Sequence, residues 1–127
     1  MAASTALANA INDYTLRGVA MAAPAAARYI GFNTGDPGAT GANEMAGGSY
    51  ARSADVTAAF NASASGVADN SANITVTAAA GTATHWSCWS APTGGSFIRG
   101  GALSAPQVCL DGQLFTFSAG DLEGTVT

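Results

Sequence analysis

The chain has 127 residues, a net charge of −4 and only 9% charged residues, with four arginines and no lysine. Its length is that of one domain, and the lack of a basic cluster argues against nucleic-acid binding. No stretch reaches the ~20 apolar residues that a membrane-spanning helix needs. A surface this poor in charge indicates that much of it is an interface, although neutral polar residues could also keep a monomer in solution.

The N-terminal segment predicts a short amphipathic helix within residues 2–17. Its apolar residues recur at helical spacing and include Leu7, Ile11 and Tyr14. Ser4 or Thr5 is the expected N-cap, and Gly18 the expected stop. The apolar stripe needs cover from the chain's own β domain or from a neighbour. Because Arg17 follows the apolar positions, the segment does not resemble a signal peptide.

The remainder of the chain predicts short strands separated by turn residues. We expect residues 1–23 to form a helix and linker arm, and residues 24–127 to form a β domain. The number and spacing of strands predict a mainly β fold, an antiparallel sandwich or jelly-roll-like domain. Residues 35–48 are expected to form a long loop and residues 61–70 a polar connection. The expected strands are residues 28–34, 50–58, 73–78, a hairpin over 82–103, a second hairpin over 105–117, and 122–127.

The hairpin over residues 82–103 is the expected core. It contains Trp86 and Trp89 on opposite faces of one strand, so both faces should be covered, by a second sheet or by a neighbouring subunit. Residues 91–95 supply its turn. In the second hairpin, Asp111 and Gly112 form a strong two-residue turn signal. We interpret Cys88 and Cys109 as buried free thiols.

Residues that could support catalysis or metal binding are few. The single histidine, His85, has no nucleophile motif beside it, and Ser90, Ser96 and Ser104 are chance neighbours in a serine-rich sheet. His85, Cys88 and Cys109 lack the spacing of a zinc site. Asp36, Asn43 and Glu44 in the long loop could supply oxygen ligands for calcium. Their spacing, however, matches no known calcium-binding motif. We therefore expect neither enzyme activity, nor a metal, nor a cofactor.

Two consecutive segments carry a family resemblance. Residues 29–41 read Tyr-Ile-Gly-Phe-Asn-Thr-Gly-Asp-Pro-Gly-Ala-Thr-Gly, and residues 43–52 read Asn-Glu-Met-Ala-Gly-Gly-Ser-Tyr-Ala-Arg. With later pieces such as residues 92–98 and 117–122, they resemble a family of small tailed-bacteriophage virion proteins. Residues 87–90, Ser-Cys-Trp-Ser, depart from the family pattern. The resemblance implies a β-rich oligomer, often a trimer. Members of this family are described as capsid decoration, head-fibre or tail-fibre proteins.

We expect a capsid decoration protein, assembled in the host cytoplasm, that binds the major capsid protein on the capsid exterior as a homo-oligomer. The alternative is a tail-tip or tail-fibre component that recognises a host glycan, for which Trp86 and Trp89 would have to be exposed. The residues expected at interfaces come from the helix, the long loop and the expected strand 50–58: Leu7, Ile11, Tyr14, Asp36, Pro37, Glu44, Met45, Tyr50 and Arg52.

Overall fold

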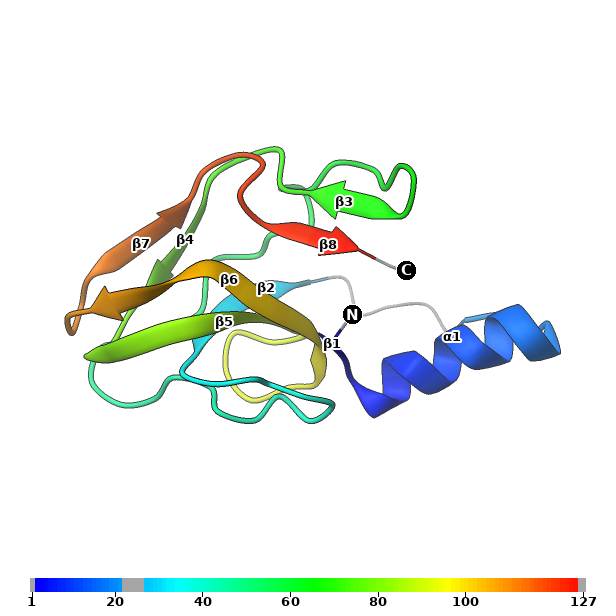
Figure 1. The fold of residues 1–127 in the computed structure, drawn as a ribbon, viewed down its shortest axis with the longest axis horizontal. Helices are drawn as coiled ribbons and strands as arrows, with labels where there is room; N and C mark the ends of the chain where they lie inside the picture. The colour runs from blue at the N-terminus through cyan, green and yellow to red at the C-terminus, as the bar shows by residue number, and fades with distance from the viewer. Residues whose placement is uncertain (1, 22–26, 126–127) are drawn as a thin grey trace.

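The computed structural model describes residues 2–21 and 27–125. Within them the chain is mainly β, with one helix, α1 (Thr5–Arg17), and antiparallel strand pairs, which confirms the predicted fold class (Figure 1). The strands are β1 (Ala2–Ala3), β2 (Tyr29–Asn33), β3 (Val67–Asp69), β4 (Ile74–Thr77), β5 (Gly81–Trp89), β6 (Phe97–Cys109), β7 (Leu114–Phe117) and β8 (Glu123–Thr125).

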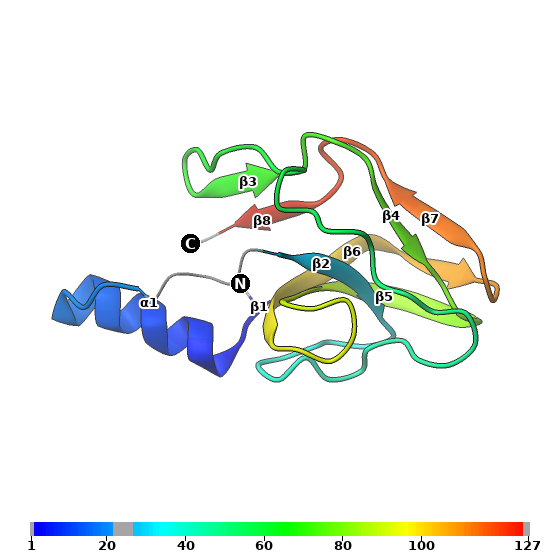
Figure 2. The ribbon, with the colours of Figure 1, turned by 180° about the vertical axis from the view of Figure 1, so that it is seen from behind.

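The strands form one larger sheet and two small ribbons. The larger sheet has the order β1-β6-β5-β2, and the ribbons pair β3 with β8 and β4 with β7. In two opposite views, the β4-β7 ribbon lies over one end of the sheet and the β3-β8 ribbon over the other (Figures 1 and 2). Two separate ribbons thus stand where a sandwich would have a continuous second sheet, and the jelly-roll detail stays a prediction.

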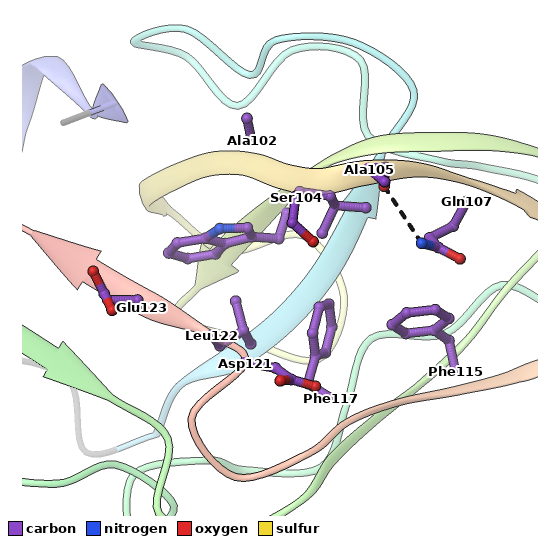
Figure 3. A pocket seen from close by; sticks show the side chains of 11 residues that line it. Ala102, Ser104, Ala105, Gln107, Phe115, Phe117, Asp121, Leu122 and Glu123 are labelled. Carbon is purple, nitrogen blue, oxygen red and sulfur yellow. Dashed lines mark hydrogen bonds between the residues drawn. The ribbon is translucent and has the colours of Figure 1, made fainter.

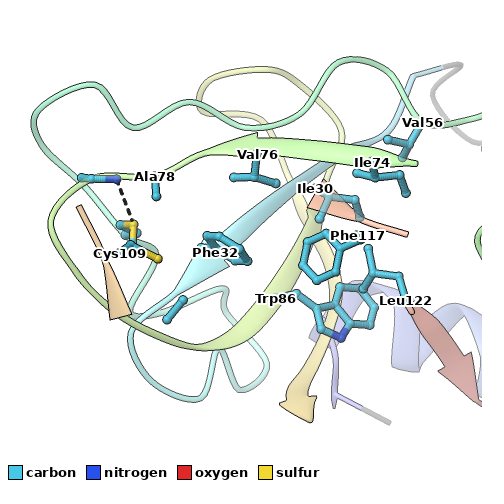
Figure 4. Packing of buried hydrophobic residues seen from close by; sticks show 13 residues of the cluster. Ile30, Phe32, Val56, Ile74, Val76, Ala78, Trp86, Cys109, Phe117 and Leu122 are labelled. Carbon is cyan, nitrogen blue, oxygen red and sulfur yellow. Dashed lines mark hydrogen bonds between the residues drawn. The ribbon is translucent and has the colours of Figure 1, made fainter. Parts of the chain in front are cut away.

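The hydrophobic core lies between the sheet and the β4-β7 ribbon (Figure 4). Phe32 of β2 is fully buried and makes edge-to-face contacts with Phe115 and Phe117 of β7, with centroids 5.1 and 5.6 Å apart. Ile74 and Val76 of β4 are buried while Thr75 between them is exposed, which confirms the predicted alternation. Aromatic pairs of this geometry add about 0.5–1.5 kcal/mol beyond their burial.

The β5–β6 hairpin forms as predicted, with its loop at residues 90–96. Trp86 and Trp89 are 7% and 9% exposed, so this chain alone covers both faces of β5. Trp86 belongs to the core, whereas Trp89 is covered by the loop after β2. Gly41 in that loop has φ +77°, and a Cβ atom there would lie 2.7 Å from the Trp89 ring. A glycine is therefore needed where the loop crosses the indole.

The predicted strand over residues 50–58 is wrong. Within the described residues, this segment contributes only an isolated bridge between Ala51 and Thr77. Side-chain oxygens bond the edge of β2 instead: Tyr50 Oη accepts from the Phe32 N–H at 3.2 Å, and Ser53 Oγ from the Ile30 N–H at 2.9 Å. Because these hydroxyls take the place of backbone carbonyls, the segment closes the edge of the sheet without extending it.

The predicted second hairpin is also wrong in its pairing. Asp111 and Gly112 do form a turn, closed by the Gln113 N–H and the Leu110 carbonyl at 3.1 Å. After the turn, however, β7 pairs with β4 and not with β6. This pairing places Phe115 over Phe32, where its ring is partly buried. Separately, β3 lies inside the segment expected to be only a polar connection, and it pairs with β8, the predicted last strand.

Helix α1 has the predicted caps. Ser4 Oγ accepts from the Leu7 N–H at 3.1 Å, and Gly18 ends the helix with φ 65°. The two residues of β1 pair with Arg99 and Gly100 of β6, so the start of the N-terminal arm is part of the sheet. From there α1 projects away from the β strands (Figure 1).

The expected domain boundary lies among residues 22–26, outside the described residues. In the part of the chain that the structure describes, no helix has the length and apolarity to cross a membrane.

Candidate functional site

Three of the residues expected at an interface, Glu44, Tyr50 and Arg52, bond to one another within the chain. Arg52 forms a two-pronged ion pair with Glu44, with Nε–Oε2 at 2.7 Å and Nη2–Oε1 at 2.8 Å. Tyr50 donates its hydroxyl hydrogen to Glu44 Oε2 at 2.7 Å. All three side chains pack over Gly31 of β2, where a Cβ atom would lie 2.3 Å from the Tyr50 oxygen. Burial, strengthened by the bond to Glu44, raises the pKa of Tyr50.

Arg52 also holds the β5–β6 loop. Its Nη1 donates to the carbonyls of Ala91 and Gly94 at 2.7 and 2.8 Å, and its guanidinium stacks 4.0 Å from the centroid of the Trp89 ring. Guanidinium groups are well suited to such combined carboxylate and aromatic contacts. Because every one of these contacts lies within one chain, Glu44, Tyr50 and Arg52 form an internal clasp.

The other loop candidates divide between buried and exposed positions. Pro37 and Met45 are buried, and the Met45 N–H donates to the Phe32 carbonyl at 2.8 Å. Asp36 is exposed, and its carboxylate accepts from the Gly38 N–H at 2.8 Å, a local turn contact. Of the six candidates outside α1, only Asp36 is exposed.

The helix candidates are those most available to a partner. No residue of α1 is buried, and Tyr14 is 59% exposed, while Leu7 and Ile11 are half-buried. These three residues follow the 4-then-3 spacing of a heptad seam, the pattern by which helices pack together. The only ion pair on the helix joins Arg17 and Asp13 at 3.0 Å. The structure therefore leaves Tyr14 exposed, while the described residues cover Leu7 and Ile11 only in part.

The residues considered for chemistry are not assembled into a site. Among the described residues there is no group of three His, Cys, Asp or Glu side chains placed to hold a metal ion. His85 Nδ1 is 2.8 Å from Thr84 Oγ1. Cys88 and Cys109 are free, as predicted, with Cys109 buried and Cys88 half-buried. Burial raises the pKa of the Cys88 thiol, which lowers its reactivity.

A groove between β6 and the segment from β7 to β8 was not expected from the sequence (Figure 3). It exists because β6 bulges. Ala83 and His85 of β5 pair with Gln107 and Ala102 of β6, so an advance of two residues along β5 corresponds to five residues along β6. Bulges re-aim side chains and interrupt pairing. The cavity has a volume of about 420 Å³, and its apolar lining is Trp86, Leu103, Phe115, Phe117 and Leu122.

Polar side chains from both walls surround this apolar floor. Ser104 and Gln107 come from β6, while Asp121 and Glu123 come from the opposite segment. In Figure 3 the Ser104 hydroxyl points down from β6 toward the floor, and the two carboxylates lie across from it. The only sequence signal of this groove was Pro106, which cannot donate a ladder hydrogen bond and so fits an irregular edge strand.

Comparison with known proteins places the chain within a family. A family model described as "Podophage GP4 fiber I protein gp80" matches residues 2–125, nearly the whole chain. A search of curated proteins finds no match. The family match confirms the expected resemblance to virion proteins of tailed phages.

Proposed function

The chain belongs to the family of the podophage GP4 fiber I protein gp80 and is a phage virion structural protein; from this premise we propose that it is a fibre-type subunit that assembles on the particle through α1. The observation that carries this proposal is the seam of Leu7, Ile11 and Tyr14 on a helix that projects from the β strands. Water would otherwise meet Tyr14 and the exposed parts of Leu7 and Ile11.

The partner proposed for the seam is the same helix of sister copies. Heptad spacing is self-complementary, because each seam residue can insert between those of an equivalent helix. The charged residues of α1, Asp13 and Arg17, already pair with each other and need no partner across the interface. A homo-oligomer, with a trimer favoured, would bury the three helices together and leave the β domains outside.

A second candidate is a capsid decoration protein that binds the major capsid protein on the capsid exterior. Shape favours it: the described strands form one compact body with one projecting helix and no repeating shaft (Figures 1 and 2). A protein that binds the assembled lattice and not its dissociated subunits stabilises the shell by mass action. The two candidates differ in location on the particle, which imaging distinguishes.

The test of assembly compares two sets of helix variants. Leu7→Ser with Ile11→Ser removes two seam residues, whereas Leu16→Ser removes an apolar residue that is 81% exposed and lies off the seam. Analytical ultracentrifugation should show the wild type and Leu16→Ser as oligomers and the double variant as a monomer. The double variant should also fail to sediment with particles that lack the protein. An oligomer that persists in a folded double variant would contradict the role of α1.

A further inference from the structure

We propose that the groove between β6 and the β7–β8 segment binds a neutral sugar. This inference goes beyond the proposed assembly role, because the groove lies on the β domain and α1 contributes no residue to its lining. Its volume of about 420 Å³ falls within the range of small-molecule pockets. Its distinguishing property is an aromatic floor beneath a rim that offers both donors and acceptors.

The floor suits the apolar C–H face of a sugar ring. Phe115 and Phe117 lie side by side below β6, with centroids 5.1 Å apart (Figure 3). Phe115 is half-buried, so part of its ring is accessible from the groove. Trp86 lines the same cavity. Trp86 and Phe117 are only 7% and 4% exposed, so a flat ligand with one apolar face would cover mainly the accessible part of Phe115.

The rim supplies unused hydrogen-bonding groups. The carboxylate of Glu123, the hydroxyl of Ser104 and the indole N–H of Trp86 make no hydrogen bond to any described residue. Asp121 uses one oxygen, which accepts from the Ser118 N–H at 3.0 Å, and its other oxygen is free. Gln107 makes only a long contact with the Ala105 carbonyl, at 3.4 Å. Each sugar hydroxyl can donate to a carboxylate and accept from an N–H or O–H group.

The structure argues against an added peptide strand in this groove. Next to it, β1 shows how a strand pairs with the outer edge of β6, at Arg99 and Gly100. Beyond that point β6 bulges, and Pro106 has no N–H to donate. A regular ladder therefore cannot continue along the groove, whereas a ligand held by side chains does not need one.

The charges of the rim argue against an acidic ligand. Asp121 and Glu123 are both negative, and no basic side chain is among the described residues that line the cavity. Arg99 lines the adjoining cavity, which shares Trp86, Ala102 and Glu123 with the groove, and its Nη2 donates to the Thr125 carbonyl at 3.0 Å. Within the groove itself, an anionic sugar would meet two carboxylates and no cation. A neutral sugar uses the same carboxylates as acceptors.

The experiment is a ¹H–¹⁵N NMR titration of the full chain. The probes are neutral mono- and disaccharides of gluco, galacto, manno and 6-deoxy configuration, with cationic glucosamine and anionic glucuronate as charged counterparts. The two indole N–H signals provide an internal comparison, because Trp89 Nε1 is bonded to Ser87 Oγ at 2.8 Å and lies outside the groove. We expect at least one neutral sugar to shift the Trp86 indole signal and the amides of β6 and residues 121–123, but not the Trp89 indole signal. A dissociation constant on the order of 1 mM is expected for a ligand of this size.

Two groove variants and one distant control make the assignment specific. Glu123→Gln removes a charged acceptor at an exposed position and should weaken binding about tenfold. Ser104→Phe fills the groove, also from an exposed position, and should abolish the shifts. Asp13→Asn on α1 removes a carboxylate far from the groove and should leave binding unchanged. Melting curves should show that all three variants are folded.

Three results would overturn the inference. The first is no shift of the Trp86 indole with any neutral sugar at about 50 mM, far above the expected dissociation constant. The second is a response to glucosamine or glucuronate alone, which would identify a site for a cation or an anion. The third is equal shifts at both indoles or equal binding by Ser104→Phe. The titration needs no particles, so it can fail while the assembly role stands, and the reverse is equally possible.

Discussion

Replacing Arg52 with alanine should destabilise the fold strongly, although the residue lies in a loop. The side chain of Arg52 is only 5% exposed, and that of its partner Glu44 is 21% exposed. The substitution removes the two-pronged ion pair, two hydrogen bonds to the β5–β6 loop and the stacking on Trp89. Glu44 would then keep only the hydroxyl of Tyr50 as a partner.

The expected loss follows from what is left behind. Removing one partner of a buried ion pair costs about 3–5 kcal/mol, because the remaining charge is neither paired nor fully hydrated. Glu44 is partly exposed, so water can reach it, and we place the loss at about 3 kcal/mol. For a domain of this size, such a loss lowers the melting temperature by about 10 °C.

Urea unfolding followed by tryptophan fluorescence measures this loss, and the chain contains a matched control. Arg17 pairs with Asp13 at 3.0 Å, but those side chains are 68% and 43% exposed. Arg17→Ala should therefore cost only about 0.3–0.5 kcal/mol. If Arg52→Ala costs less than about 1 kcal/mol, as an exposed pair would, the internal clasp does not stabilise the fold as described.

Three further substitutions test local features. Gly41→Ala should lower the free energy of unfolding by about 2–5 kcal/mol, because φ is positive and the new Cβ clashes with Trp89. Gly38→Ala, with φ +57° and no atom within 4 Å, should lower it by only about 1–2 kcal/mol. Equal losses in urea unfolding would refute the close approach of Gly41 to Trp89. Ser4→Ala should reduce the helical circular dichroism signal, because the cap contributes about 0.5–2 kcal/mol; an unchanged signal would show that the cap is dispensable. The raised pKa of Tyr50 means that its protonated form stabilises the fold, fully so below about pH 10, the unfolded value. Stability should therefore fall as the pH rises above about 10, and less steeply in Tyr50→Phe; identical slopes in urea titrations would contradict this.

The elements that the sequence predicted correctly are those determined by neighbouring residues. Helix α1 depends on Ser4 and Gly18, both within a few residues of its ends. The β5–β6 hairpin depends on glycines at its own turn, and Gly94 and Gly95 indeed have φ values of 59° and 71°. Local chemistry of this kind can be read directly because the contacts it creates are close in sequence.

The wrong predictions concern choices between distant partners. The alternating pattern of β7 fits pairing with β6 or with β4 equally well, and the packing of Phe115 and Phe117 on Phe32 favours β4. Likewise, residues 50–58 have the composition of a strand, but the oxygens of Tyr50 and Ser53 bond β2 in place of a backbone ladder. Neither outcome is encoded in a local pattern.

The candidate site was predicted only in part. The apolar seam of α1 was visible from its spacing, and the structure shows that the described residues cover it only in part. Glu44, Tyr50 and Arg52 were also expected at an interface; the structure shows them bonded to one another, and their interface role stays a prediction. The groove depends on a bulge whose size is set by the pairing of β6 with β5, so the sequence alone could not locate it.

The most direct test of the assembly role is cryo-electron microscopy of particles incubated with the labelled protein. We expect symmetric density attached to the particle, with the helices bundled together and the β domains outside. Density among the fibres would support the fibre-type role, and density over the capsid lattice would support decoration. Absence of bound density, or density in which the α1 helices are separate and exposed to solvent, would contradict assembly through α1.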